Sequence, residues 1–376
     1  MPLAPALDES LAVSAPAPAG ALAGPRLDPL LLGGLSFLVP LTAVALFSSG
    51  AAPQALGRLE KWLVLALVSP HFLVSYQLLY WDRRKDLLRE RKLLFAAVLV
   101  PAALAALLAD VWLSSSPVVP LRLLVHGMLA LSCWHYLKQS YGCAVVGCAL
   151  AGSPLAAAER RALYANLVAL GAWAFCAPNA AGGRFDYGGL SFARLAIPPA
   201  ACWAAAAAFV LSLGRLGQLL AGRWREGRAP APAATAALLG FYIWTAPILV
   251  YPAVFSAFRF VPLTAALHSL QYLTFAGPLR WNRLSRLAPG PVSPRRVAGF
   301  AGGWLLMATV LGPALFYRLP GWLDRAVAYD AARLGPIFFL GAIHLFVNVH
   351  HYFIDGAIWR SDNEELRALV ASRRGR

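Results

Sequence analysis

Histidines are the residues of this chain whose type and placement could support chemistry. All seven fall inside long apolar stretches, and the more polar segments between those stretches contain no histidine. Ionisable side chains are rare in a membrane segment and generally face the interior of a helix bundle, where something binds them. A polar site within a membrane-spanning fold is therefore expected. The seven are His71, His126, His135, His268, His344, His350 and His351.

The depth of each histidine follows from the rise of about 1.5 Å per helical residue. His71, His268 and His344 each lie ten or eleven residues from the predicted inner end of an apolar stretch. That spacing places them roughly 15 Å from the cytoplasmic boundary, near the middle of a core about 30 Å thick. We expect these three to bind a metal at the midplane. His135 and His351 lie nearer the cytoplasm and either complete that site or form a second one below it.

The last apolar stretch carries the strongest local pattern. At 100° per residue, His344, Asn348, His351 and Asp355 fall on one narrow polar stripe, which is predicted to face other helices rather than lipid. By the same rule His268, Gln271 and Tyr272 share a face. The other polar neighbours expected near the site are Ser75, one turn after His71, together with Lys138 and His350.

A transition metal is the most economical explanation of these groups, because neutral imidazole binds iron, copper and zinc. Iron is the metal we expect, with copper or haem as alternatives. Asn348, Gln271, His350 and Ser75 are expected to orient the ligating histidines. Tyr272 is a candidate for proton or hydrogen-atom delivery, and Lys138 and Asp355 are candidates for proton relay or headgroup binding.

Three function classes fit this pattern. The first is a metal-dependent oxidoreductase that acts on a lipid-soluble substrate. The second is a proton-coupled transporter that uses the same His, Asp and Lys side chains as a relay, and the third is a non-catalytic assembly subunit. The clustered His boxes of membrane desaturases and hydroxylases are missing. The dispersed pattern is similar to the general plan of haem–copper oxidases and membrane carotenoid dioxygenases, but their motifs do not align with this chain.

Composition indicates that these residues lie in a membrane protein, so membrane-spanning segments must position them. Of the 376 residues, 59% are hydrophobic and only 13% are charged, whereas a soluble protein carries roughly 25% charged residues. A soluble enzyme is therefore excluded. The net charge of +16 does not indicate a nucleic-acid partner, because the cations lie in short clusters between apolar runs. The expected partners are membrane lipids and a lipophilic small molecule.

The predicted fold class is an all-α, polytopic integral membrane helix bundle. Residues 1–27 are expected to be a disordered tail rich in Ala and Pro, residues 28–359 the transmembrane helical domain, and residues 360–376 a basic cytoplasmic tail. Placing both termini in the cytoplasm puts most of the 33 Lys and Arg side chains on that side. The preference for Arg and Ala suggests a bacterial inner membrane. The ten predicted spans are 30–48, 62–81, 93–113, 121–141, 162–177, 197–217, 234–252, 261–278, 298–317 and 336–355.

Overall fold

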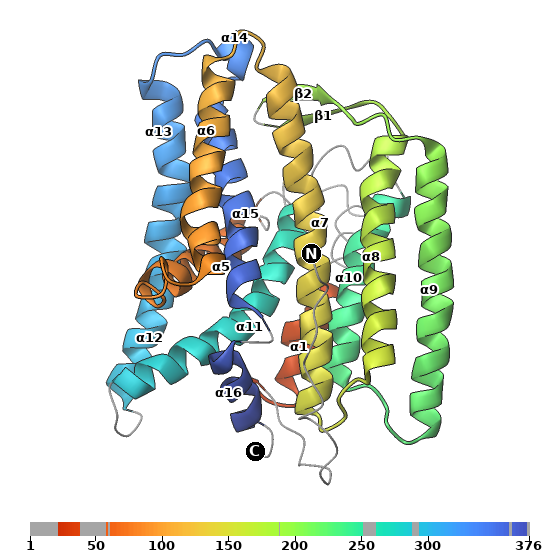
Figure 1. Cartoon of the computed structure of the whole chain (residues 1–376). Coiled ribbons are helices and arrows are strands. Elements are labelled where there is room, and N and C mark those ends of the chain that lie inside the picture. Colours follow the sequence, from red (N-terminus) through yellow and green to blue (C-terminus); the bar gives the residue numbers. More distant parts are fainter. Residues whose placement is uncertain are drawn as a thin grey trace.

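The computed structural model describes residues 22–37, 58, 61–187, 189–250, 261–287, 293–360 and 363–373. These residues form a bundle of long helices with one short β-hairpin at one end (Figure 1). Six helical stretches are long and apolar enough to cross a membrane, as expected for a multi-pass membrane protein. They are Lys61–Trp81, Arg91–Leu113, Val118–Leu150, Pro199–Arg225, Pro294–Ala326 and Ala331–Ile358.

Several of these stretches contain π-helical turns. The first comprises η3 (Val64–Val68), α4 (Ser69–Tyr76) and η4 (Gln77–Trp81), and the second comprises α5 (Arg91–Leu94), η5 (Phe95–Leu99) and α6 (Val100–Leu113). Pro70 and Pro101 follow η3 and η5 closely. Proline has no N–H group, so it cannot complete the regular helical hydrogen bonds in these turns.

The middle of the chain forms uninterrupted helices. These are α7 (Val118–Leu150), α8 (Ala157–Ala180), α9 (Pro199–Arg225), α10 (Pro232–Val250) and α11 (Val261–Leu287). The antiparallel hairpin of β1 (Arg184–Tyr187) and β2 (Leu190–Ala193) connects α8 to α9. Helix α11 runs obliquely across the bundle, whereas α7, α8 and α9 stand side by side (Figure 1).

The C-terminal part begins with one long helical stretch that again contains π-helical turns. That stretch is α12 (Pro294–Leu306), η7 (Met307–Leu311), η8 (Ala314–Arg318) and α13 (Leu319–Ala326). It is followed by α14 (Ala331–Leu334), α15 (Phe338–Ile358) and α16 (Glu364–Arg373). The last nine predicted spans each overlap a helical stretch, but six described stretches are long and apolar enough to cross a membrane, so the count of ten spans stays a prediction. Most of the first, 30–48, lies outside the described residues.

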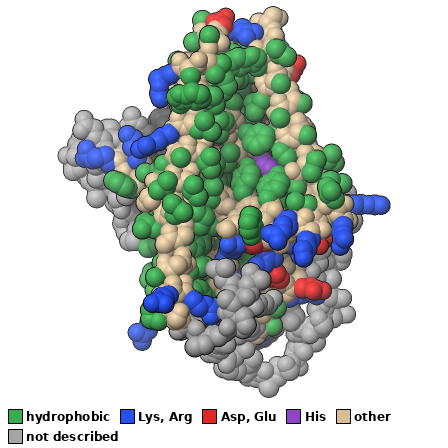
Figure 2. Space-filling view, turned by 90° about the vertical axis from the view of Figure 1, so that its left-hand side faces the viewer, with side chains coloured by type: hydrophobic (Ala, Val, Ile, Leu, Met, Phe, Trp, Pro, Cys, Tyr) green, Lys and Arg blue, Asp and Glu red, His purple; other side chains and the backbone are tan. Residues whose placement is uncertain are grey.

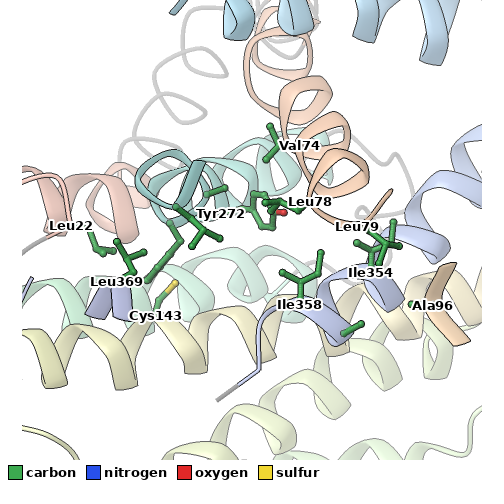
Figure 3. Close-up of a cluster of buried hydrophobic side chains, with 14 of the residues drawn as sticks. Leu22, Val74, Leu78, Leu79, Ala96, Cys143, Tyr272, Ile354, Ile358 and Leu369 are labelled. Atoms are coloured by element: carbon green, nitrogen blue, oxygen red, sulfur yellow. The ribbon is translucent and has the colours of Figure 1, made fainter. Parts of the chain in front are cut away.

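A core of buried side chains joins the two ends of the chain. Helix α1 (Leu27–Leu32) and the short 3₁₀ turn η2 (Gly34–Phe37) pack near α10. Leu22 is buried near Leu369 of α16 in a cluster that also contains Tyr272 and Ile354 (Figure 3). The backbone N–H of Leu22 donates to Asp28 Oδ2. Folded structure therefore begins before residue 28, where the sequence placed the end of a disordered tail; residues 1–21 of that tail lie outside the described residues.

Candidate metal centre

Four histidines from four helices meet in the interior of the bundle. His71 comes from α4, His135 from α7, His268 from α11 and His351 from α15. Each histidine offers one ring nitrogen as a donor atom, and these four nitrogens all lie within 4.8 Å of one another. His71 Nε2 is 2.7 Å from His351 Nε2, and His135 Nε2 is 3.0 Å from His268 Nε2. We call these four residues the four-histidine cluster.

The cluster is enclosed by protein. The exposed fraction is 8% for His135 and 3% or less for the other three side chains. Burying polar groups is costly unless they find partners, and bonds between transmembrane helices of this type typically contribute only about 0.6 kcal/mol each. Four imidazoles in one buried position exceed what helix association requires.

Asp355 of α15 adds a carboxylate to the edge of the cluster. Its Oδ2 atom lies 3.4 Å from His351 Nε2 and 3.6 Å from His135 Nε2. Its Oδ1 atom accepts a hydrogen bond of 3.2 Å from the Ser75 hydroxyl. Ser75 also lies 2.7 Å from the Tyr272 hydroxyl, and the Tyr272 ring stacks on His71 with a centroid separation of 4.1 Å. The cluster therefore has a polar side formed by Ser75, Tyr272 and Asp355.

His135 and His351 lie in one group with His71 and His268 and do not form a second layer. Helix α7 is longer than its predicted span, since it ends at Leu150 rather than residue 141. His135 therefore lies further from the end of its helix than predicted. Because α11 crosses the bundle obliquely (Figure 1), His268 reaches the same point from a helix that extends to Leu287.

The structure does not bring His344 into the cluster, contrary to the expected midplane group. Its Nε2 atom lies 3.0 Å from the backbone oxygen of Phe316 in η8. His344 and His351 share a helical face, but seven residues separate them by about 10 Å along α15, too far to bind one ion. The predicted stripe therefore gave the correct helical face for His344 and His351. Their separation along the helix axis prevents them from binding the same ion.

Lys138 also lies apart from the cluster. Its side chain is exposed, and its ammonium nitrogen lies 5.3 Å from the ring centroid of Tyr164 on α8. The long side chain follows the surface of α7 toward its neighbour, as lysine commonly does at an apolar surface. A role for Lys138 next to the histidines therefore has no geometric support.

The expected orienting residues are distributed around the site. Ser75 belongs to the polar side of the cluster, where it bonds to Tyr272 and Asp355. Gln271 donates to the backbone oxygen of Leu32 and accepts from Gln139, whose amide also donates to the backbone oxygen of His268. This pair of amides fixes α11 against α7 and α1. Asn348 donates to the backbone oxygen of His344.

His350 forms a separate polar group beside the cluster. Its Nε2 atom lies 2.9 Å from the backbone oxygen of Ala96, so this nitrogen carries the hydrogen. Its Nδ1 atom is then the acceptor for the Tyr76 hydroxyl at 2.9 Å. The Tyr80 hydroxyl donates to the backbone oxygen of Ala97. His350 therefore connects α15 to α4 and η5 and takes no part in the ligand set.

Aromatic side chains complete the surroundings of the cluster. Tyr136 stacks on His268 at 4.3 Å, and Tyr352 lies 4.6 Å from the ring of His135. Phe72 contacts His351 at 5.1 Å and Phe316 at 5.7 Å between ring centroids. Phe72 and Phe316 could not be identified from the sequence, since an apolar ring in an apolar helix carries no distinguishing pattern.

The donor set fits a transition metal. With metal–imidazole bonds of about 2.0–2.1 Å, neighbouring ligand nitrogens lie roughly 3.0–3.4 Å apart. Two pairs, at 2.7 and 3.0 Å, are close to that spacing, and donor atoms up to 4.8 Å apart would have to move inward around an ion. Asp355 Oδ2 is buried and has no hydrogen-bond partner among the described residues, as is also true of the Nδ1 atoms of His71, His268 and His351. A cation would compensate the buried carboxylate.

The chain was compared with protein-family models, with curated proteins and with solved structures, and no match was found. The functional assignment therefore depends on the geometry of the site.

Proposed function

We propose that the protein is an integral membrane oxidoreductase in which the four-histidine cluster binds a single transition metal, with iron favoured over copper. The observation that supports this best is the convergence of four buried imidazole nitrogens from four different helices within 4.8 Å. Imidazole is a common ligand of iron and copper in redox sites. Haem is disfavoured, because the close approach of the Nε2 atoms leaves no space for a macrocycle between facing rings.

The bound metal would supply redox chemistry at this position, and the surrounding residues would control access and protons. Ser75 connects the Asp355 carboxylate to the Tyr272 hydroxyl through hydrogen bonds. These groups can hold and transfer a proton at the edge of the cluster. Asp355 also contributes a negative charge that offsets part of the metal's charge in a medium of low dielectric constant.

The substrate we propose is lipid-soluble and reaches the cluster from the bilayer. Figure 2 shows a hollow between apolar side chains on one face of the bundle. The four histidines of the cluster are 8% exposed or less, so protein separates them from this hollow. Phe72 is half-buried and touches both Phe316 and His351. An apolar molecule entering by this path would meet the Phe72 ring before it met the cluster.

Metal content of matched variants tests the proposal. We expect near-stoichiometric metal in the purified unchanged chain and its loss in His135→Gln, which removes an imidazole from the cluster. His126→Gln is the control on the same helix, because His126 bonds the backbone oxygen of Arg122 one turn away. His344→Gln should likewise retain metal. The measurement is elemental analysis of monodisperse protein in detergent.

Two results would contradict the proposal. Full metal content in His135→Gln would show that the cluster is not the binding site. Metal-free protein that drives proton-coupled solute uptake in liposomes would instead favour the transporter interpretation of the same polar residues.

A further inference from the structure

A second candidate binding site lies away from the histidines, in an apolar pocket between α9 and α10. Helix α9 packs along α8, and α10 packs against α7 and α8. The pocket has a volume of about 550 Å³, within the range of roughly 300–1,000 Å³ typical of small-molecule sites. Its walls include Leu163 of α8, Leu216 and Leu220 of α9, and Leu238 of α10. Nearly all of the lining is carbon.

The charged groups at the pocket are one ion pair, which carries no net charge, and one additional cation. Glu159 lines the pocket, and its Oε2 atom accepts a hydrogen bond of 3.0 Å from Arg223, which is itself 1% exposed. Arg223 also donates to the backbone oxygen of Pro154. Arg225 lines the same pocket but is exposed, and it makes no ion pair among the described residues. The rim therefore carries a net positive charge.

The position of the pocket along the helices identifies the chemistry of its occupant. It lies at the C-terminal end of α9, among the cations from Arg215 to Arg228 that the positive-inside pattern places at the cytoplasmic surface. Trp224 lines the pocket and is 70% exposed, as is common for tryptophan at the level of lipid headgroups. An apolar pocket with a cationic rim at that level matches an acyl chain attached to an anionic headgroup.

We propose that this pocket binds one anionic phospholipid, with an acyl chain between α9 and α10 and the headgroup phosphate at Arg225. The pocket is independent of the four-histidine cluster, so the proposal does not rest on the proposed catalytic function. A bound lipid would fill the space between two helices that both pack on α8 and would stabilise their spacing.

Substitution of small lining residues tests whether an acyl chain occupies the pocket. Ala221 is exposed and lines the pocket, so Ala221→Trp fills it without disturbing the core. Ala207→Trp is the matched control, because Ala207 is exposed on nearly the same face of α9 about four turns away. Thr235→Trp fills the pocket from α10 and serves if Ala221→Trp does not yield monodisperse protein.

The experiment uses the full chain reconstituted with equal amounts of phosphatidylglycerol and phosphatidylcholine, followed by detergent extraction and native mass spectrometry. We expect one retained phosphatidylglycerol in the unchanged chain and in Ala207→Trp, and loss of that lipid in Ala221→Trp. Arg225→Gln should lower the preference for phosphatidylglycerol roughly fivefold, whereas Arg215→Gln, an exposed α9 cation outside the pocket, should not.

Three outcomes would overturn the proposal. They are no retained lipid in the unchanged chain, equal retention by Ala221→Trp and Ala207→Trp, and equal retention of the two lipid types by the unchanged chain.

Discussion

Asp355 is the residue that most clearly distinguishes this cluster from a set of helix-linking histidines. Its Oδ2 atom lies within 3.6 Å of Nε2 atoms on two different helices and has no hydrogen-bond donor among the described residues. Helix association alone would not require a buried carboxylate in this position, because removing a charge from water costs several kcal/mol. A cation at the cluster would compensate this carboxylate.

We predict that Asp355→Asn lowers metal affinity about 10- to 100-fold, the usual effect of removing a partner of ligating histidines. The amide keeps the shape and the hydrogen bond from Ser75 but removes the charge. Affinity can be measured by competition with a chelator of known strength. Asp186→Asn, in the exposed part of β1, is the control. Equal affinity in the two variants would limit Asp355 to a structural role.

Sequence periodicity identified much of the candidate site at the residue scale. Four of the five proposed ligands lie together, and Ser75, Tyr272 and Asp355 lie beside them as expected. His344 was misplaced because angular position on a helix says nothing about separation along its axis. Lys138 was misplaced because a flexible side chain of four carbons can extend away from its helical face.

At the scale of elements, Gly312 sets how closely the long C-terminal helical stretch approaches α4. A Cβ atom built at Gly312 would lie 2.3 Å from the Ser69 Cβ and 2.9 Å from the Met307 backbone oxygen. Ser69 is two residues before His71 and is buried. Close packing at this glycine therefore helps hold the first histidine of the cluster in position.

Gly312→Ala should destabilise the protein by about 1–3 kcal/mol, the usual cost of overpacking, and should also weaken metal binding, since α4 must shift. Gly302→Ala is the control in the same helical stretch, because a Cβ there has no neighbour within 4 Å. Thermal unfolding in detergent and metal content are the two measurements. Equal stability of both variants would show that the contact with Ser69 is easily relaxed.

Helix boundaries limited what the sequence could predict about the elements. Hydropathy located α7, but a span of about 20 residues ended the prediction at residue 141, directly after the polar residues Gln139 and Ser140. In the structure Ser140 is buried and Gln139 bonds to α11. His268 and Gln271 of α11 accept the hydrogen bonds of the Gln139 amide, and the helix continues through Ser140 to Leu150.

At the scale of the whole molecule, the orientation follows from the distribution of cations. Lys and Arg side chains gather below the apolar zone in Figure 2, toward the end where α16 lies in Figure 1. Ion pairs from Arg280 and Arg283 to Asp82, and from Arg283 to Glu365, connect α11, the end of η4 and α16 there. We expect this end to face the cytoplasm and the β-hairpin to face the opposite side.

Cysteine accessibility tests this orientation. In a chain with Cys133, Cys176 and Cys202 replaced by serine, Ser191→Cys in the hairpin should react with a membrane-impermeant maleimide applied to intact cells. Arg228→Cys, exposed at the other end, should react only after the cells are opened. The reverse result would invert the topology and place the phospholipid pocket in the outer leaflet.

Two prolines leave backbone oxygens available to polar side chains of other helices. A proline leaves the carbonyl four residues earlier without its helical donor. Pro101 stands four residues after Ala97, and Pro320 stands four residues after Phe316. The oxygens of Ala97 and Phe316 instead accept hydrogen bonds from Tyr80 and His344. Main-chain oxygens therefore hold polar side chains of other helices. Such a hydrogen bond does not depend on the side chain of the residue that supplies the oxygen. A chain diverging from this one would keep both anchoring oxygens after a change of side chain at Ala97 or Phe316, provided that it kept the proline four residues later.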